Sequence, residues 1–115
     1  MKPHYGCPVQ ATVNVMSGKW KVQILWHLSF GALRFAELRG KLKGVSEKVM
    51  AAQLRQMEAN GMVAREVIPG NPPGTSYSLT PAGMELIPAM ESLCAWGTTH
   101  LGVPSNLPRH PSPAA

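Results

Sequence analysis

The segment from residue 35 to residue 80 constrains the fold of this chain most, because its order of elements fits few architectures. Apolar side chains recur at helical spacing over 35–42, and a short turn containing a glycine follows at 43–45. A second amphipathic helix is expected over 46–60, and then a hairpin with two prolines in its loop. Helix, short turn, helix and hairpin in this order predict a winged helix-turn-helix.

The second helix of the pair is the best specified element. Ser46 suits the N-cap position, since its hydroxyl can accept a hydrogen bond from a free backbone N–H of the first turn. Met50, Leu54 and Met57 fall on one face and form the expected buried stripe. Gly61 stands where a helix commonly ends in a left-handed residue. The sequence therefore predicts both ends and the inward face of this helix.

A hairpin, the wing of such a fold, is expected after this helix. The segments 63–68 and 76–79 are expected to be its strands, and 69–74 its loop, because Gly and Pro crowd that stretch. The chain carries no charge from Pro69 to Ser76, and Arg65 is the one basic residue close by. Two roles remain open for the loop: contact with phosphates through backbone N–H groups, or a stiff connection.

Helices are also expected on both sides of this segment. A short apolar helix begins at Pro8 with Cys7 as its cap, and another helix is ended by Gly31. Thr80 followed by Pro81 starts the last long helix. Four prolines lie among residues 102–115, which we expect to be disordered. We therefore divide the chain into one domain, 1–101, and a tail, 102–115.

Composition agrees with one small basic domain. The chain has 115 residues and a net charge of +5, and nine of its eleven Lys and Arg residues lie in 19–65. Such a concentration of positive charge suits a phosphate backbone, although a generic basic surface would give the same count. No apolar run reaches the roughly 18 residues that cross a bilayer. Met1–Gln10 has no apolar core of a secretory signal, so we expect a cytoplasmic protein without a membrane partner.

The outward face of the 46–60 helix carries the predicted DNA contacts. About 100° per residue places Lys48, Ala52 and Arg55 opposite the buried stripe, and small residues beside long basic ones suit close approach to base edges. Gln53 or Gln56 could also pair with adenine. The alternative is an ordinary solvated face. The candidate DNA-binding residues are Arg34, Ser46, Lys48, Ala51, Ala52, Arg55 and Arg65.

Several short motifs make the chain resemble the HxlR family of bacterial winged helix regulators over roughly residues 7–97. The matching motifs are Cys7-Pro8-Val9, Gly18-Lys19-Trp20-Lys21, Arg34-Phe35, Glu37-Leu38, Gln53-Leu54-Arg55, Glu58, Gly61, Pro72-Pro73, Tyr77-Ser78-Leu79-Thr80, Gly83 and Leu93 to Trp96-Gly97. The chain departs from the family pattern in one place, since uncharged Gly74-Thr75-Ser76 follows the proline pair where relatives commonly carry charge.

The resemblance implies an α+β, mainly α fold: a winged helix-turn-helix domain with terminal dimerisation helices. It also implies a homodimeric transcription factor whose two recognition helices, each starting at Ser46, bind a near-palindromic operator in double-stranded DNA. We expect a repressor, since excluding polymerase needs nothing beyond the dimer. The dimer residues implied are Val9, Val13, Ile87, Met90 and Cys94.

Two cysteines are candidates for a regulatory signal. Some family members use a cysteine at the position of Cys7 to sense oxidants or electrophiles, and a helix N-terminus stabilises a thiolate. The alternative is a small apolar cap buried in the dimer interface. Cys94 is expected in the core or the interface, and could pair with Cys7 of the other subunit.

Other functions have less support. The histidines share no metal-ligand spacing with the cysteines, and no nucleophile with a base partner is recognisable. We therefore expect no metal, no cofactor and no enzyme. Two alternatives remain: a winged helix used as a protein-interaction module, and a small-molecule effector bound between subunits by Trp20, Trp26 and Trp96.

Overall fold

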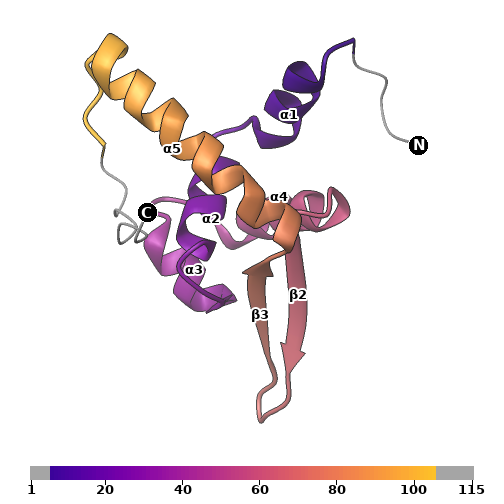
Figure 1. The fold of residues 1–115 in the computed structure, drawn as a ribbon. Coiled ribbons are helices and arrows are strands. Elements are labelled where there is room, and N and C mark those ends of the chain that lie inside the picture. The colour runs from indigo at the N-terminus through magenta and orange to yellow at the C-terminus, as the bar shows by residue number, and fades with distance from the viewer. Residues whose placement is uncertain (1–5, 106–115) are drawn as a thin grey trace, which may run out of the picture.

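The computed structural model describes residues 6–105, which form a group of helices from which a hairpin projects (Figure 1). The elements in chain order are α1 (Pro8–Met16), α2 (Lys21–Leu28), β1 (Leu33–Arg34), α3 (Phe35–Lys41), α4 (Glu47–Ala59), β2 (Val63–Ile68), β3 (Gly74–Leu79) and α5 (Pro81–Leu101). This arrangement is a winged helix-turn-helix and confirms the predicted fold class. Most of the expected disordered tail, residues 106–115, lies outside the described residues.

The core lies where α2, α3 and α4 meet the base of the sheet. Its most deeply buried side chains are Ile24, Leu25, Leu38, Leu42, Met50, Leu54, Met57 and Val63. All three members of the predicted α4 stripe are among them, so the inward face of that helix is as expected. Removing such apolar side chains from water is the main force that stabilises a small domain.

The sheet contains one strand that the sequence did not predict. β1 pairs antiparallel with β3, opposite Tyr77 and Ser76, and gives the strand order β1-β3-β2. Two residues are too short to show the alternation that marks a strand. The expected loop at 69–74 was one residue too long, because Gly74 already pairs with Ile68. A Cβ on Gly74 would lie 3.2 Å from Nη1 of Arg34, so glycine leaves room for that side chain.

Both ends of α4 are built as the sequence predicted. At the start, the Ser46 hydroxyl accepts a hydrogen bond from the Val49 N–H at 3.1 Å. At the end, Gly61 has a φ of +78°, and the Met62 N–H donates to the Met57 carbonyl at 3.0 Å. This is the hydrogen-bond pattern of a glycine-terminated helix, and it turns the chain directly into β2.

Thr80 ties the start of α5 to the end of α4. Its hydroxyl donates to the Gly61 carbonyl at 2.6 Å and accepts from the Gly83 N–H at 3.1 Å. Its backbone N–H donates to the Met62 carbonyl at 3.1 Å. Gly83 packs so closely on that carbonyl oxygen that an added Cβ would overlap it.

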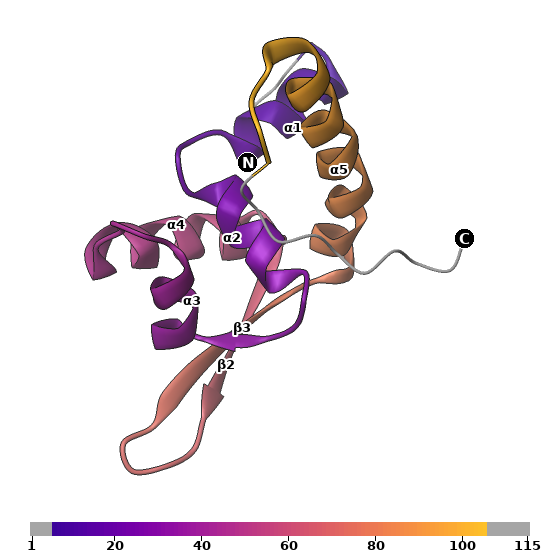
Figure 2. The ribbon, with the colours of Figure 1, turned by 90° about the vertical axis from the view of Figure 1, so that its left-hand side faces the viewer.

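The two terminal helices extend away from this core (Figures 1 and 2). α1 buries only Met16, and α5 buries Gly83, Ile87 and Met90, all in its first half. Within residues 6–105, no helix has the length and hydropathy needed to cross a membrane. Both outer segments therefore leave apolar surface uncovered in a single protomer.

We predict that Gly83→Ala destabilises the protein by about 2 kcal/mol, because the new methyl group must push the Met62 backbone away. Urea denaturation measures the change. Gly40→Ala is the matched control, since Gly40 lies in α3 with open space around it. The control should be neutral or slightly stabilising. Equal stability of the two variants would contradict the close packing at Gly83.

Candidate DNA-binding surface

The outward face of α4 presents the predicted basic residues to solvent. Lys48 and Arg55 are exposed, whereas Ala51 and Ala52 are half-buried between them and the core. The two cations stand about two helical turns apart on one side of α4, with small side chains between them. This surface can approach a polyanion closely without steric obstruction.

Val49 adds an apolar group to this surface that the sequence did not single out. It lies in the first turn of α4, and 41% of its surface is exposed. Its methyl groups could meet a thymine methyl in the major groove. An apolar residue that falls outside the buried stripe near the start of a helix was the signal that could have identified it.

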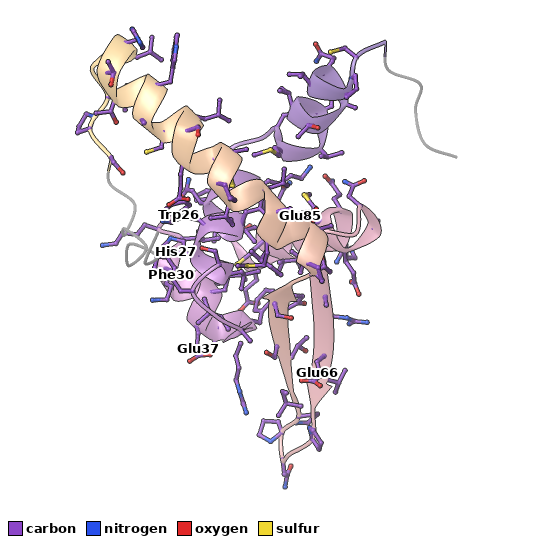
Figure 3. The ribbon with its side chains drawn as sticks, viewed as in Figure 1. Trp26, His27, Phe30, Glu37, Glu66 and Glu85 are labelled. Atoms are coloured by element: carbon purple, nitrogen blue, oxygen red, sulfur yellow. The ribbon has the colours of Figure 1, made fainter. Side chains whose placement is uncertain are left out.

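Arg34 brings a positive charge to the wing, whose loop has none of its own. β1 places Arg34 opposite Ser76, and its guanidinium lies beside Gly74. Its backbone N–H donates to Glu37 Oε1 at 2.8 Å, which fixes the start of α3. Glu66 of β2 carries a negative charge at the same level of the wing, because Arg34 and Glu66 both pair with Ser76 of β3 (Figure 3).

Arg65 lies at the base of the wing, beside the end of α4. Its Nε is 3.9 Å from Glu58 Oε2, and both side chains are partly exposed. Such an exposed pair contributes about 0–1 kcal/mol, so a phosphate can compete for the arginine. In the absence of such a competitor, Glu58 neutralises part of its charge.

Arg39 braces the turn between α3 and α4. Its Nε donates to the Val45 carbonyl at 3.2 Å, and its Nη1 lies 3.3 Å from Glu47 Oε1. Sequence periodicity could not identify these contacts, because they join residues six and eight positions apart in the chain. These contacts fix the angle between the two helices of the helix-turn-helix.

The two glutamines of α4 face the turn between α1 and α2 rather than the face that carries Arg55. Gln56 Oε1 accepts a hydrogen bond from Lys21 Nζ at 2.6 Å. Gln53 Oε1 lies 3.8 Å from the place that a Cβ on Gly18 would take. Pairing of Gln56 with adenine, one of the open alternatives, would require this arrangement to change.

Cys7 is exposed at the N-terminus of α1. The backbone N–H groups of Gln10 and Val9 lower the pKa of its thiol, with a small opposing effect of burial. Cys94 is also exposed, so placing it in the core was wrong for a single protomer. It lines an apolar hollow of about 280 Å³, formed by Met16, Val22, Trp26, Met90, Leu93 and Cys94.

The five predicted dimer residues divide into two groups. Val9 and Val13 are 70% and 53% exposed, and Cys94 is exposed as well. Ile87 and Met90 are only 6% and 5% exposed, so they belong to the protomer core and offer almost no surface to a partner. Sequence periodicity identifies an apolar helix face but does not say which neighbour covers it.

Metal binding finds no support in the described part of the chain. Residues 6–105 contain no group of three His, Cys, Asp or Glu side chains arranged to hold a metal ion. The features of the site are therefore its charges, its small side chains and its two thiols.

Comparison with known proteins agrees with this architecture. Residues 15–104 match the family model described as HxlR-like helix-turn-helix. The HTH-type transcriptional regulator YtcD of Bacillus subtilis is 39% identical over 100 residues, which cover 87% of this chain and 79% of YtcD.

Two solved redox-related structures are also similar. The reduced form of the redox regulator HypR superposes with a TM-score of 0.77 at 37% identity, covering 83% of this chain and 94% of that one. Reduced YodB from B. subtilis gives a TM-score of 0.75 at 28% identity, covering 84% and 95%.

The fold and the similarity to helix-turn-helix regulators define a helix-turn-helix transcriptional regulator. The chain belongs to the HxlR-like helix-turn-helix family. Cys7 precedes the residues that match the family model, so that match does not assign it a role. Its role has to be inferred from its own surroundings.

We predict that alkylation of Cys7 by iodoacetamide rises with pH to an inflection below that of an ordinary thiol, because the lowered pKa gives thiolate at lower pH. The rate is measured in a Cys94→Ser background, so that only one thiol reacts. In urea, where α1 is unfolded, the inflection should return to the ordinary value. The same inflection with and without urea would contradict an effect of the α1 amide groups.

Proposed function

We propose that this protein is a homodimeric, sequence-specific regulator that inserts α4 into the major groove of double-stranded DNA. The observation that carries the proposal is the outward face of α4, where exposed Lys48 and Arg55 flank small half-buried alanines. Arg55 can donate to guanine and the alanine methyl groups can meet thymine, while Lys48 and Ser46 lie near the end that approaches phosphate. Binding to chromosomal DNA would require the protein to be cytoplasmic.

The charge distribution supports this orientation. Two carboxylates near the surface, Glu47 and Glu58, already pair with Arg39 and Arg65. Lys48 and Arg55 form no ion pair with any described residue, so their charges are free for a polyanion. Arg34 would extend the contact to the backbone beside the wing.

A dimer is supported by the terminal helices. Val9 and Val13 of α1, with Leu93 and Trp96 of α5, expose large apolar side chains. Exposed apolar groups on two helices that a protomer leaves uncovered suit a second copy. Two-fold symmetry would place two α4 helices on a near-palindromic operator. Repression needs only that the bound dimer exclude polymerase.

A redox signal is supported by Cys7 and by the similarity to two proteins. HypR is a redox regulator, and YodB has been solved in reduced and diamide-treated forms. We propose that oxidants or electrophiles act at Cys7. Oxidation by diamide would remove two hydrogens from two thiols, forming one disulfide and reducing the diamide to a hydrazine. Cys94 of the other subunit is the candidate for the second thiol.

Two observations favour alternatives. The wing has an uncharged loop and an exposed Val67, which suits a protein-interaction module. The hollow beside Trp26 suits a small apolar effector rather than an electrophile. In the first case binding to DNA would show no sequence preference. In the second, regulation would not need Cys7.

We predict that Arg55→Ala weakens operator binding by about 1–3 kcal/mol and relaxes the preference for one base pair, if Arg55 reads a base. Binding to the operator and to single-base variants of it is measured by fluorescence anisotropy. Arg39→Ala is not a suitable control, because Arg39 braces the turn. Lys41→Ala removes a charge from the end of α3 without touching α4. An equal loss on every duplex for Arg55→Ala would show a phosphate contact instead.

We predict that diamide changes operator affinity in the wild-type protein and has no effect in Cys7→Ser. Cys94→Ser tests whether the second thiol is Cys94, in which case a disulfide-linked dimer disappears from a non-reducing gel. A diamide effect that persists in Cys7→Ser would exclude Cys7 as the sensor.

A further inference from the structure

The start of α2 and the turn before it lie beside two glutamines of α4. Lys21, the first residue of α2, donates from Nζ to Gln56 Oε1 at 2.6 Å. The turn itself passes close to Gln53 at Gly18, which has a φ of +114°. A Cβ on Gly18 would lie 3.8 Å from Gln53 Oε1. Gln53 and Gln56 are three residues apart and therefore share one side of α4.

Lys21 stands where a positive charge is disfavoured. Only 8% of the residue's surface is exposed, and its bond to Gln56 is partly buried, so burial removes part of the hydration of its ammonium group. It also lies in the first turn of α2, where the helix dipole is positive and no acidic side chain is present. Among residues 6–105 no carboxylate lies within 4 Å of its Nζ, and Gln56 is its one side-chain partner.

This placement costs stability that an apolar residue of similar size would not cost. Positions that break local rules in this way concentrate at functional sites, where another requirement outweighs stability. Gln56 directly follows Arg55 on α4. A bond that fixes Gln56 therefore fixes the rotation of the helix turn that carries the proposed base contact.

We propose that Lys21 is a positioning residue for DNA recognition, which acts through Gln56 and does not itself touch DNA. The inference rests on the proposed function of α4. A recognition group has to stay within about 0.5 Å of its productive position, and supporting hydrogen bonds supply that precision. The same bond connects α4 to the start of α2, which follows α1 in the chain. Cys7 lies at the opposite end of α1.

The test compares Lys21→Met, Gln56→Met and the double variant. Affinity for the operator and for a scrambled duplex is measured over a range of salt concentrations, together with the melting temperature. Each single variant should weaken operator binding roughly tenfold, the effect expected for loss of one charged hydrogen bond. The double variant should be no weaker than either single one, because all three lack the same bond.

Three further results are expected. Binding to the scrambled duplex and the slope of affinity against salt should stay unchanged, because no phosphate contact is lost. Lys21→Met should melt at the same temperature as the wild type or higher, since Met removes a buried charge. Lys19→Met is the matched control: Lys19 is exposed, its Nζ lies 4.8 Å from the centre of the Trp20 ring, and it forms no hydrogen bond or ion pair with α4 within the described residues. It should not affect the operator preference selectively.

Two results would overturn the inference. If Lys21→Met lowers the salt slope by about one phosphate contact while Gln56→Met has no effect, Lys21 touches DNA directly. If both variants melt earlier and keep full operator affinity, the bond is only structural. If Lys21→Met fails to fold, the Gln56→Met variant alone tests the inference, because Gln56 is exposed. Failure of the proposed function would appear in the wild type, as binding without operator preference.

Discussion

Burial of the apolar stripe of α4 is the contact on which the rest of the molecule depends. Met50 and Met57 are fully buried and Leu54 is 1% exposed, and each such side chain contributes roughly 1.5–3 kcal/mol. A helix that buries one face must expose the opposite one. The packing of these three side chains therefore also determines that Lys48 and Arg55 face outward.

The surroundings of α4 make its placement more precise. Its first turn is capped by Ser46, and its end is closed at Gly61, where Thr80 joins the start of α5. Lys21 binds the side of α4 that carries Gln56 through a hydrogen bond. The helix is thus restrained at both ends and along one side, while Lys48 and Arg55 on its outward face form no ion pair with any described residue.

The sequence was most informative where the chemistry is local. The cap at Ser46, the left-handed Gly61 and the stripe of α4 each depend on residues a few positions apart, and all were predicted. β1 and the Lys21–Gln56 bond join residues distant in the chain, and the Arg39 contacts span a turn without periodicity; none of these was predicted. Ile87 and Met90 show the same limit, because the family resemblance implied a place at the dimer surface, whereas the protomer itself covers both side chains.

The most direct test of sequence recognition by α4 is the affinity of the purified wild-type protein for DNA upstream of its own gene and for a scrambled duplex. At about 0.15 M salt, we predict a preference for the upstream DNA on the order of a thousandfold or more. Affinity should also fall steeply as salt rises, because several phosphate contacts release counterions. Equal, weak binding to both duplexes and to tiled chromosomal fragments would contradict the claim that α4 reads DNA sequence.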